Sequence, residues 1–197
     1  MKSYAIANLE RAPDERFFRR VERLATLGVD IIQLRAKTLP APEAAAIARE
    51  CRRRTAGSST RLLINGRIDV AIDEGLDGVH LASNAVSSTA VRSAAPGLLV
   101  GRSCHSLDDV GRAAQEGFDY VLLGPVHPPR SKHGASGVSL EDLRRAVGSG
   151  VDVFALGGFS AGNLSQLRGV PVAGVAGITL YMEDEPLDRI LEAVRAL

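Results

Sequence analysis

A serine and a histidine lie two residues apart in the segment Gly101-Arg102-Ser103-Cys104-His105-Ser106. The apolar residues before this segment predict a strand, and the pattern after it predicts a helix with Ser106 as its N-cap. Because strand side chains alternate between faces, Ser103 and His105 are expected to point to one side and Cys104 to the other. Imidazole titrates near neutral pH, so His105 is a candidate for proton transfer. A hydrogen bond to a loop carbonyl is the alternative role.

Other polar side chains occur in a strand predicted over residues 30–37, whose alternation places Gln33, Arg35 and Lys37 on one face. A cation on an inward strand face needs an anionic partner, so a bound carboxylate or phosphate is one explanation. A buried polar layer that holds the strands together is the other. Asn65 ends the next predicted strand, at residues 61–65.

A long loop is predicted from Gly124 to Gly137, and loops of this length inside a compact domain are usually functional. Lys132 lies within it, beside Ser131 and His133. The sequence leaves open whether Lys132 contacts a ligand or is only solvated.

Strands and helices are predicted to alternate eight times along the chain. The strands are expected at residues 4–9, 30–37, 61–65, 78–81, from 98, 119–123, 151–156 and 170–176. The helices are expected at 15–27, 40 to about 55, 70–74, 87–94, 107–116, 139–146, 160–167 and 186–197. Eight such units predict an α/β fold, a single (β/α)₈ TIM barrel that forms one domain over residues 1–197. A doubly wound sheet is disfavoured because no GxGxxG follows the first strand.

In a barrel, the polar residues that follow each strand meet at one rim. Gly157 and Gly158 follow the seventh strand, and a stretch from Gly174 through Gly177 to Thr179 surrounds the eighth. Small residues expose backbone N–H groups there, which predicts a phosphate site. Tight turns without a ligand are the alternative. Asp119 and Asp152 begin strands, so both are expected at the opposite rim with a structural role.

Composition limits the other classes of function. The chain has 197 residues, 45% hydrophobic and 24% charged, with a net charge of +1, which gives no electrostatic case for nucleic acid or an acidic membrane. Two cysteines exclude a disulfide framework, and no HExxH or cysteine cluster supplies a transition-metal site. Without a signal peptide or membrane-length apolar run, a cytoplasmic location is expected. The sequence leaves a homo-oligomer open.

The chain resembles the thiamin phosphate synthase and thiazole tautomerase family of thiamin biosynthesis over nearly its whole length. The matching segments are residues 32–37 (IQLRAK), 63–69 (LINGRID), 78–81 (GVHL), 101–106 (GRSCHS), 119–126 (DYVLLGPV) and 155–158 (ALGG). Their order and spacing together are specific. The resemblance implies a barrel that binds a thiazole phosphate, with the phosphate at Gly158 and the backbone of Ile178 and Thr179.

The same resemblance implies one of two activities. A synthase joins hydroxymethylpyrimidine diphosphate to the thiazole phosphate and needs Mg²⁺ held by two aspartates. The first aspartate is expected after Asn65, where this chain has Gly66, and the second falls within residues 82–86, which read ASNAV. Without these hard anionic ligands the sequence predicts no metal site, which disfavours the synthase. The long loop has Pro129 and Ser131 where the synthase pattern has threonines, although Lys132 is retained.

We therefore predict a thiazole tautomerase, an isomerase that needs no cofactor and acts on a small-molecule thiazole carboxylate phosphate. In this reaction one carbon loses a proton and the exocyclic carbon gains one. His105 is expected to move the proton, Ser103 and Gln33 to position the ring, and Arg35 to bind the carboxylate. Lys37, Asn65 and Lys132 are further expected substrate contacts. A synthase with a remodelled Mg²⁺ site and a non-catalytic thiazole phosphate-binding regulatory protein are the alternatives.

Overall fold

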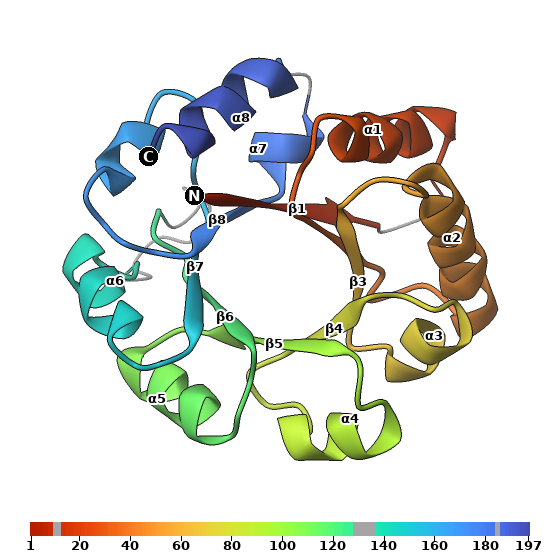
Figure 1. The fold of residues 1–197 in the computed structure, drawn as a ribbon, viewed down its shortest axis with the longest axis horizontal. Helices are drawn as coiled ribbons and strands as arrows, with labels where there is room; N and C mark the ends of the chain where they lie inside the picture. The colour runs from red at the N-terminus through yellow and green to blue at the C-terminus, as the bar shows by residue number, and fades with distance from the viewer. Residues whose placement is uncertain (10–12, 128–136, 184–185) are drawn as a thin grey trace.

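Eight parallel strands form a closed barrel in the computed structural model, which describes residues 1–9, 13–127, 137–183 and 186–197 (Figure 1). Each strand pairs with the next along the chain, and β1 closes the ring by pairing with β8. The strands are β1 (Lys2–Asn8), β2 (Ile31–Arg35), β3 (Arg61–Asn65), β4 (Gly78–Leu81), β5 (Leu99–Cys104), β6 (Tyr120–Leu123), β7 (Asp152–Leu156) and β8 (Gly174–Gly177). The predicted (β/α)₈ TIM barrel is confirmed.

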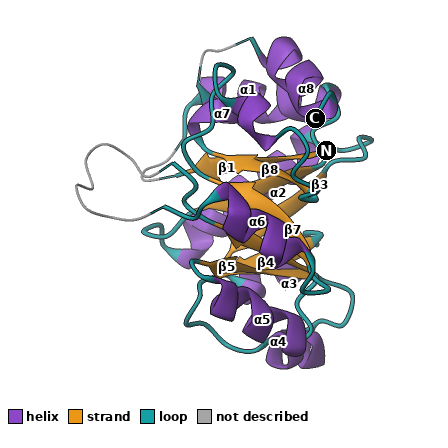
Figure 2. Cartoon of the chain, turned by 90° about the vertical axis from the view of Figure 1, so that its left-hand side faces the viewer, coloured by secondary structure: helices purple, strands orange, loops and turns teal. Residues whose placement is uncertain are grey.

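Helices surround the barrel on the outside in both ribbon views (Figures 1 and 2). The described helices are α1 (Glu15–Thr26), α2 (Ala41–Arg54), α3 (Ile68–Asp73), α4 (Ser88–Ala94), α5 (Leu107–Gln115), α6 (Leu140–Val147), the 3₁₀ helix η1 (Leu164–Leu167), α7 (Thr179–Met182) and α8 (Leu187–Arg195). None of the helices in the described segments is both long and apolar enough to cross a membrane.

Side-chain caps define where several of these helices begin. The Ser106 hydroxyl accepts the Asp109 N–H at the start of α5, as the sequence predicts. Ser139 and Asp142 form a reciprocal capping box at the start of α6. Because these caps satisfy N–H groups that a helix leaves unpaired, they fix the residues at which α5 and α6 begin.

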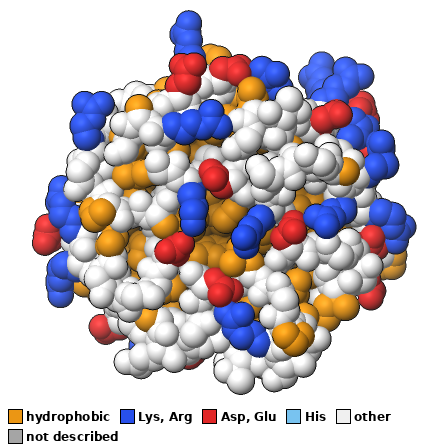
Figure 3. Space-filling view, in the orientation of Figure 1, with side chains coloured by type: hydrophobic (Ala, Val, Ile, Leu, Met, Phe, Trp, Pro, Cys, Tyr) orange, Lys and Arg blue, Asp and Glu red, His pale blue; other side chains and the backbone are white. Residues whose placement is uncertain are grey.

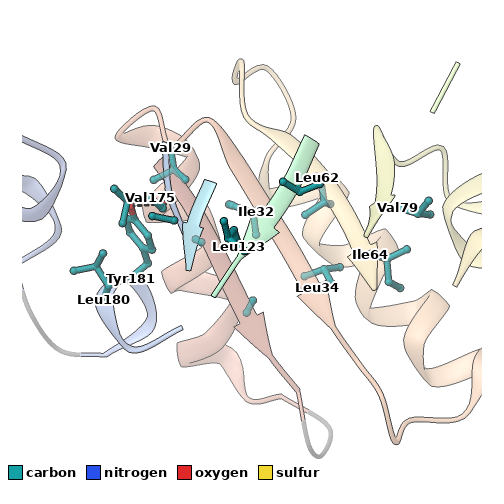
Figure 4. Close-up of a cluster of buried hydrophobic side chains, with 14 of the residues drawn as sticks. Val29, Ile32, Leu34, Leu62, Ile64, Val79, Leu123, Val175, Leu180 and Tyr181 are labelled. Atoms are coloured by element: carbon teal, nitrogen blue, oxygen red, sulfur yellow. Dashed lines mark hydrogen bonds between the residues drawn. The ribbon is translucent and has the colours of Figure 1, made fainter. Parts of the chain in front are cut away.

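The barrel separates two hydrophobic cores. The outer core lies between strands and helices and includes Ile32, Leu62, Val79 and Leu123 (Figure 4). The inner core fills the barrel, and its largest side chains are those of Tyr4, Tyr120 and Phe154. Successive strand residues alternate between these cores because their side chains point to opposite faces. The inner core therefore places two phenol hydroxyls inside the barrel.

Several elements differ from the sequence prediction, most clearly in the last third of the chain. The helix predicted at 160–167 is only the four-residue η1. Strand β8 begins at Gly174 rather than at 170, because the Val172 N–H bonds locally to the Val170 carbonyl and Pro171 has no N–H for a ladder. The short helix α7 had not been predicted.

Charged side chains of both signs are interspersed over the face of the molecule shown in Figure 3. This mixture is what a net charge of +1 from 24 basic and 23 acidic residues leads us to expect. Nothing on this face resembles the single-sign surface that attracts a polyanion.

Candidate active site at the barrel mouth

The carboxyl ends of the strands meet at one end of the barrel, which we call the mouth. Gln33 on β2 and Asn65 on β3, both predicted as site residues, lie together there. The Gln33 side-chain N–H donates to Asn65 Oδ1 at 3.3 Å, and the Tyr4 hydroxyl donates to Gln33 Oε1 at 2.8 Å. Gln33 is only 1% exposed, so β2 carries a buried amide whose oxygen and nitrogen are both bonded.

Ser103 on β5 joins the same network through the His80 imidazole and the Tyr120 hydroxyl, neither of which was predicted as a site residue. Ser103 Oγ lies 2.9 Å from His80 Nε2, and His80 Nδ1 lies 3.2 Å from the Tyr120 hydroxyl. The Tyr120 and Tyr4 hydroxyls are 2.8 Å apart. These contacts make one continuous series, the hydrogen-bond chain, which consists of Ser103, His80, Tyr120, Tyr4, Gln33 and Asn65.

The tyrosines of this chain were missed because a tyrosine in an apolar strand is typical of a hydrophobic core. The signal that could have found them is that a buried tyrosine hydroxyl needs a partner. Tyr4 and Tyr120 are both fully buried or nearly so, and the polar Gln33 and His80 are the groups that satisfy them.

Burial keeps the titratable members of the chain uncharged. Burial lowers the pKa of His80 to about 3, so its imidazole is neutral at physiological pH. Burial, with the Tyr120 phenol beside it, raises the pKa of Tyr4 well above its usual value. Burial likewise raises the pKa of Tyr120. The interior of the mouth is therefore polar but carries no net charge from these groups.

The two cations predicted beside Gln33 occupy different positions. Arg35 is half-buried at the end of β2, and its guanidinium donates to Asn8 Oδ1 on the neighbouring strand β1. The prediction that Lys37 continues the same strand face is wrong, because β2 ends at Arg35 and Lys37 lies exposed in the loop beyond. Lys132 falls outside the described residues.

The predicted pairing of Ser103 with His105 on one side of a strand is also wrong. Strand β5 ends at Cys104, and the His105 N–H instead donates to Asp109 Oδ2 at 2.9 Å at the start of α5. The exposed His105 ring donates from Nδ1 to the Gly124 carbonyl at 2.8 Å. His105 lines a pocket of about 330 Å³ bordered by the first turns of α5 and α6. The described residues that line this pocket include no member of the hydrogen-bond chain.

The predicted phosphate-binding residues lie at the ends of two paired strands, β7 and β8. Gly158 has a φ of +72°, and a Cβ there would lie 2.3 Å from His127 Cβ, so only glycine fits. Gly177 ends β8, and Ile178 and Thr179 follow it at the start of α7. Within the described part of the chain, the backbone N–H groups of Gly158 and Ile178 have no backbone acceptor. The predicted phosphate site would use these two N–H groups.

The residues that would have to hold Mg²⁺ do not fit the ion. Gly66 has no side chain, and residues 82–86 supply no carboxylate. The acid nearest in sequence to Gly66 is Asp69, and both of its oxygens accept from the Arg67 guanidinium, which lowers the pKa of Asp69 to about 2. Among the described residues no group of three or more His, Cys, Asp and Glu side chains could hold a metal ion. Mg²⁺ prefers carboxylate oxygens, which this part of the mouth lacks.

In a (β/α)₈ barrel the residues that follow the strands meet at one end, and small-molecule sites of such barrels lie there. The family model described as thiamine monophosphate synthase matches residues 3–180. The chain therefore belongs to the thiamine monophosphate synthase family.

Curated relatives agree with this family. The chain is 38% identical to a thiamine-phosphate synthase of Methanoculleus marisnigri over 88% of this chain and 84% of that protein. It is 35% identical to a putative thiamine-phosphate synthase of Geobacter sulfurreducens, over 94% of this chain and 89% of that protein. A solved structure of a thiamine phosphate pyrophosphorylase from Pyrococcus furiosus superimposes with a TM-score of 0.86 at 28% identity, covering 99% of this chain and 96% of that one.

These relatives correct the predicted activity. We predicted a thiazole tautomerase, an isomerase, because the two metal-binding aspartates are missing. Relatives that align over most of both chains are instead named thiamine-phosphate synthase, a transferase. The particular proton transfer predicted for His105 belongs to the tautomerase reaction, so that step is withdrawn with the predicted activity.

Proposed function

We propose that the protein is a thiamin phosphate synthase, which couples hydroxymethylpyrimidine diphosphate to thiazole phosphate. The observation that carries this proposal is the 38% identity to the Methanoculleus marisnigri enzyme over 84% of that protein. In the reaction a bond forms between the thiazole nitrogen and the methylene carbon of the pyrimidine. The bond from that carbon to the diphosphate oxygen breaks, and diphosphate leaves with the electron pair.

The mouth offers groups suited to each part of the two substrates. The N–H groups of Gly158 and Ile178 are free of backbone partners in the described chain and would bind the thiazole phosphate. Gln33, Asn65 and Ser103 lie together on a neutral polar network and would orient a heterocyclic ring. Arg35 and Lys37 lie at the end of β2 and beyond it, where their charge would favour the departing diphosphate.

No step of this reaction is assigned to Mg²⁺, because Gly66 and residues 82–86 do not supply the two carboxylates that the synthase pattern places there. The proposal therefore gives the stabilisation of the leaving diphosphate to cationic side chains of the chain itself. Arg35 is the best placed among the described residues, since its guanidinium can bind two phosphate oxygens at once.

The test uses the purified full chain with both substrates and measures thiamin phosphate by chromatography, with and without added Mg²⁺. Formation of thiamin phosphate at a rate that falls at least tenfold in Arg35→Gln supports the proposal. Arg61→Gln is the matched control, because Arg61 begins β3 at the opposite end of the barrel. Binding of thiazole phosphate in calorimetry without any product under either condition would overturn it in favour of a non-catalytic binding protein.

A further inference from the structure

The hydrogen-bond chain contains just enough protons for each of its links to run in one direction. Ser103, Tyr120 and Tyr4 have one hydroxyl proton each, and a neutral imidazole such as His80 has one N–H. Four links connect these groups in series to Gln33 Oε1. The Gln33 oxygen can only accept, so the proton of the link to Tyr4 must come from Tyr4.

The direction of the first link determines the others. Because Tyr4 donates its only hydroxyl proton to Gln33, Tyr120 must be the donor in the 2.8 Å contact between the two tyrosine hydroxyls. Tyr120 then has no proton for His80, so His80 must donate from Nδ1. His80 Nε2 is left as an acceptor, and it receives the proton of the Ser103 hydroxyl at 2.9 Å.

Only the two end residues of the hydrogen-bond chain, Ser103 and Asn65, are in contact with solvent. Ser103 and Asn65 are half-buried, whereas Tyr4, Tyr120, His80 and Gln33 are at most 2% exposed. Asn65 pairs with His80 across β3 and β4, and Ser103 lies on β5 at the other side of β4. The exposed ends of the chain therefore flank β4 at the mouth.

We infer that Tyr4, Tyr120 and His80 are positioning residues that set the hydrogen-bond polarity of the mouth. Ser103 presents only lone pairs to a ligand, because its proton is held by His80. Asn65 presents its two N–H groups, because its oxygen already accepts from Gln33 and the amide nitrogen has no other bond among the described residues. The site thus accepts on the β5 side and donates on the β3 side, and His80 is the Nδ1–H tautomer.

This polarity selects one class of heterocycle, and the choice of probe rests on the proposed function. A 4-aminopyrimidine carries a donor, its exocyclic amine, next to a ring nitrogen that accepts. The corresponding 4-oxopyrimidine has a carbonyl acceptor and a ring N–H donor, so its polarity is reversed. Because an unmatched polar group in a desolvated site costs about the strength of a hydrogen bond, the mouth should reject the oxo compound.

If every hydrogen bond of the hydrogen-bond chain ran in the reverse direction, the donor and acceptor ends of the site would be exchanged. If the Gln33 amide were turned over, the protons would run from Gln33 to Ser103, His80 would carry its proton on Nε2, and Ser103 would donate to the ligand. The two polarities therefore predict different His80 tautomers. This difference can be measured without any substrate.

The first experiment records nitrogen-15 NMR spectra of the histidine rings of the full chain at neutral pH. The ring signals of His80 are assigned by their loss in His80→Gln. An Nδ1–H tautomer for His80 supports the inference, and an Nε2–H tautomer overturns it. Tyr120→Phe removes the acceptor of the Nδ1–H, so the tautomer should shift toward Nε2–H in that variant. Tyr181→Phe is the matched control. It removes a buried hydroxyl that donates to the Val175 carbonyl, and neither residue belongs to the hydrogen-bond chain.

The second experiment measures, by calorimetry without thiazole phosphate, the binding of the diphosphates of the 4-amino and 4-oxo pyrimidines. We expect wild type to prefer the amino compound by at least tenfold, and Tyr120→Phe to lose about tenfold of this preference while Tyr181→Phe retains it. A purely structural role of Tyr120 would lower stability in both variants and leave the preference unchanged, which would overturn the inference.

The two experiments also distinguish failure of the inference from failure of the proposed function. If thiamin phosphate forms but His80 is the Nε2–H tautomer, the inferred polarity is wrong and the proposed function stands. If no thiamin phosphate forms but His80 is Nδ1–H, the proposed function fails and the polarity stands.

Discussion

The carboxylate of Asp119, just before β6, accepts a hydrogen bond from the backbone N–H of Val100 on β5 at 2.7 Å. The same arrangement occurs twice more at this end of the barrel, where Asp30 accepts the Ser3 N–H and Asp77 accepts the Leu62 N–H, both at 2.8 Å. An N–H near the start of a buried strand needs an acceptor, and the carboxylate of the next strand supplies it.

This relationship predicts the effect of removing one carboxylate. Asp119→Ala leaves the Val100 N–H without its acceptor, so the free energy of unfolding should fall by about 1–3 kcal/mol in urea denaturation. The ion pair of Asp119 with Arg92 is partly exposed and adds little. Asp119→Asn keeps an acceptor oxygen and should retain most of the stability. Equal stability of Asp119→Ala and wild type would contradict the role, as would a large change in activity at the distant mouth.

His80 should make the stability of the fold depend on pH. Burial lowers the pKa of His80 from 6.5 to about 3. Between these values the unfolded chain binds a proton that the native protein does not, so stability decreases as pH falls, by about 1.4 kcal/mol per pH unit. Above pH 6.5 the ring is neutral in both states and makes no contribution. Among the described groups in contact with the ring, the titratable one is Tyr120, which stays protonated over this range.

The measurement compares urea unfolding of wild type and His80→Gln at neutral pH and at about one pH unit below the ordinary histidine pKa. Wild type should lose about 1.4 kcal/mol more than the variant between the two conditions, because other titrating groups are common to both. The same pH dependence in both proteins would show that His80 charges freely in the folded state.

The fold could be predicted because the strand and helix signals are strong and local. The bounds of β3 and β4 agree with the predicted segments, since each is a short apolar run ended by a turn. The N-caps at Ser106 and Ser139 could likewise be predicted from residue type and spacing. The four-residue α7 was missed because so short a helix has no periodicity of its own and is held by tertiary contacts.

The site was only partly predictable. Gln33 was predicted as part of a polar strand face, and Asn65 because it ends a strand at the barrel rim. Tyr4 and Tyr120 resemble ordinary core residues until the barrel closes and brings β1 and β6 across from one another. The position of His105 depended on where β5 ends, and strand ends are set by neighbouring strands rather than by local sequence. The predicted activity was wrong because it was inferred mainly from carboxylates and loop threonines that this chain lacks, and the absence of a residue does not identify a reaction.

Gly158 offers a test of the predicted phosphate site. At a φ of +72°, the left-handed conformation destabilises an alanine by roughly 1–2 kcal/mol relative to glycine. The alanine Cβ would also lie 2.4 Å from the His127 carbonyl oxygen, which is a steric clash. Gly158→Ala should therefore lower stability by more than that cost and weaken thiazole phosphate binding at least tenfold in calorimetry. Gly57 is the matched control, with a φ of +79° and no heavy atom within 4 Å of the place where a Cβ would lie. If Gly57→Ala weakened binding as much, the turn at Gly158 would have no special part in holding phosphate.

The missing metal ligands lead to a gain-of-function prediction at Gly66. This residue has a φ of +71° and open space around a Cβ, and aspartate and asparagine tolerate that conformation better than other side chains. Gly66→Asp should place a carboxylate beside Asn65, where Mg²⁺ bound to a diphosphate could use it as a ligand. We expect Mg²⁺ to tighten diphosphate binding by at least tenfold more in Gly66→Asp than in wild type, a difference of about 1.4 kcal/mol.

Gly66→Asn is the matched control, because it has the same shape and backbone tolerance without the charge. Calorimetric titration of diphosphate with and without Mg²⁺, at constant ionic strength, should give wild-type behaviour for Gly66→Asn. A wild-type protein that already binds the Mg²⁺ complex as tightly as Gly66→Asp would contradict the prediction, because acids outside positions 66 and 82–86 would then have to serve the ion.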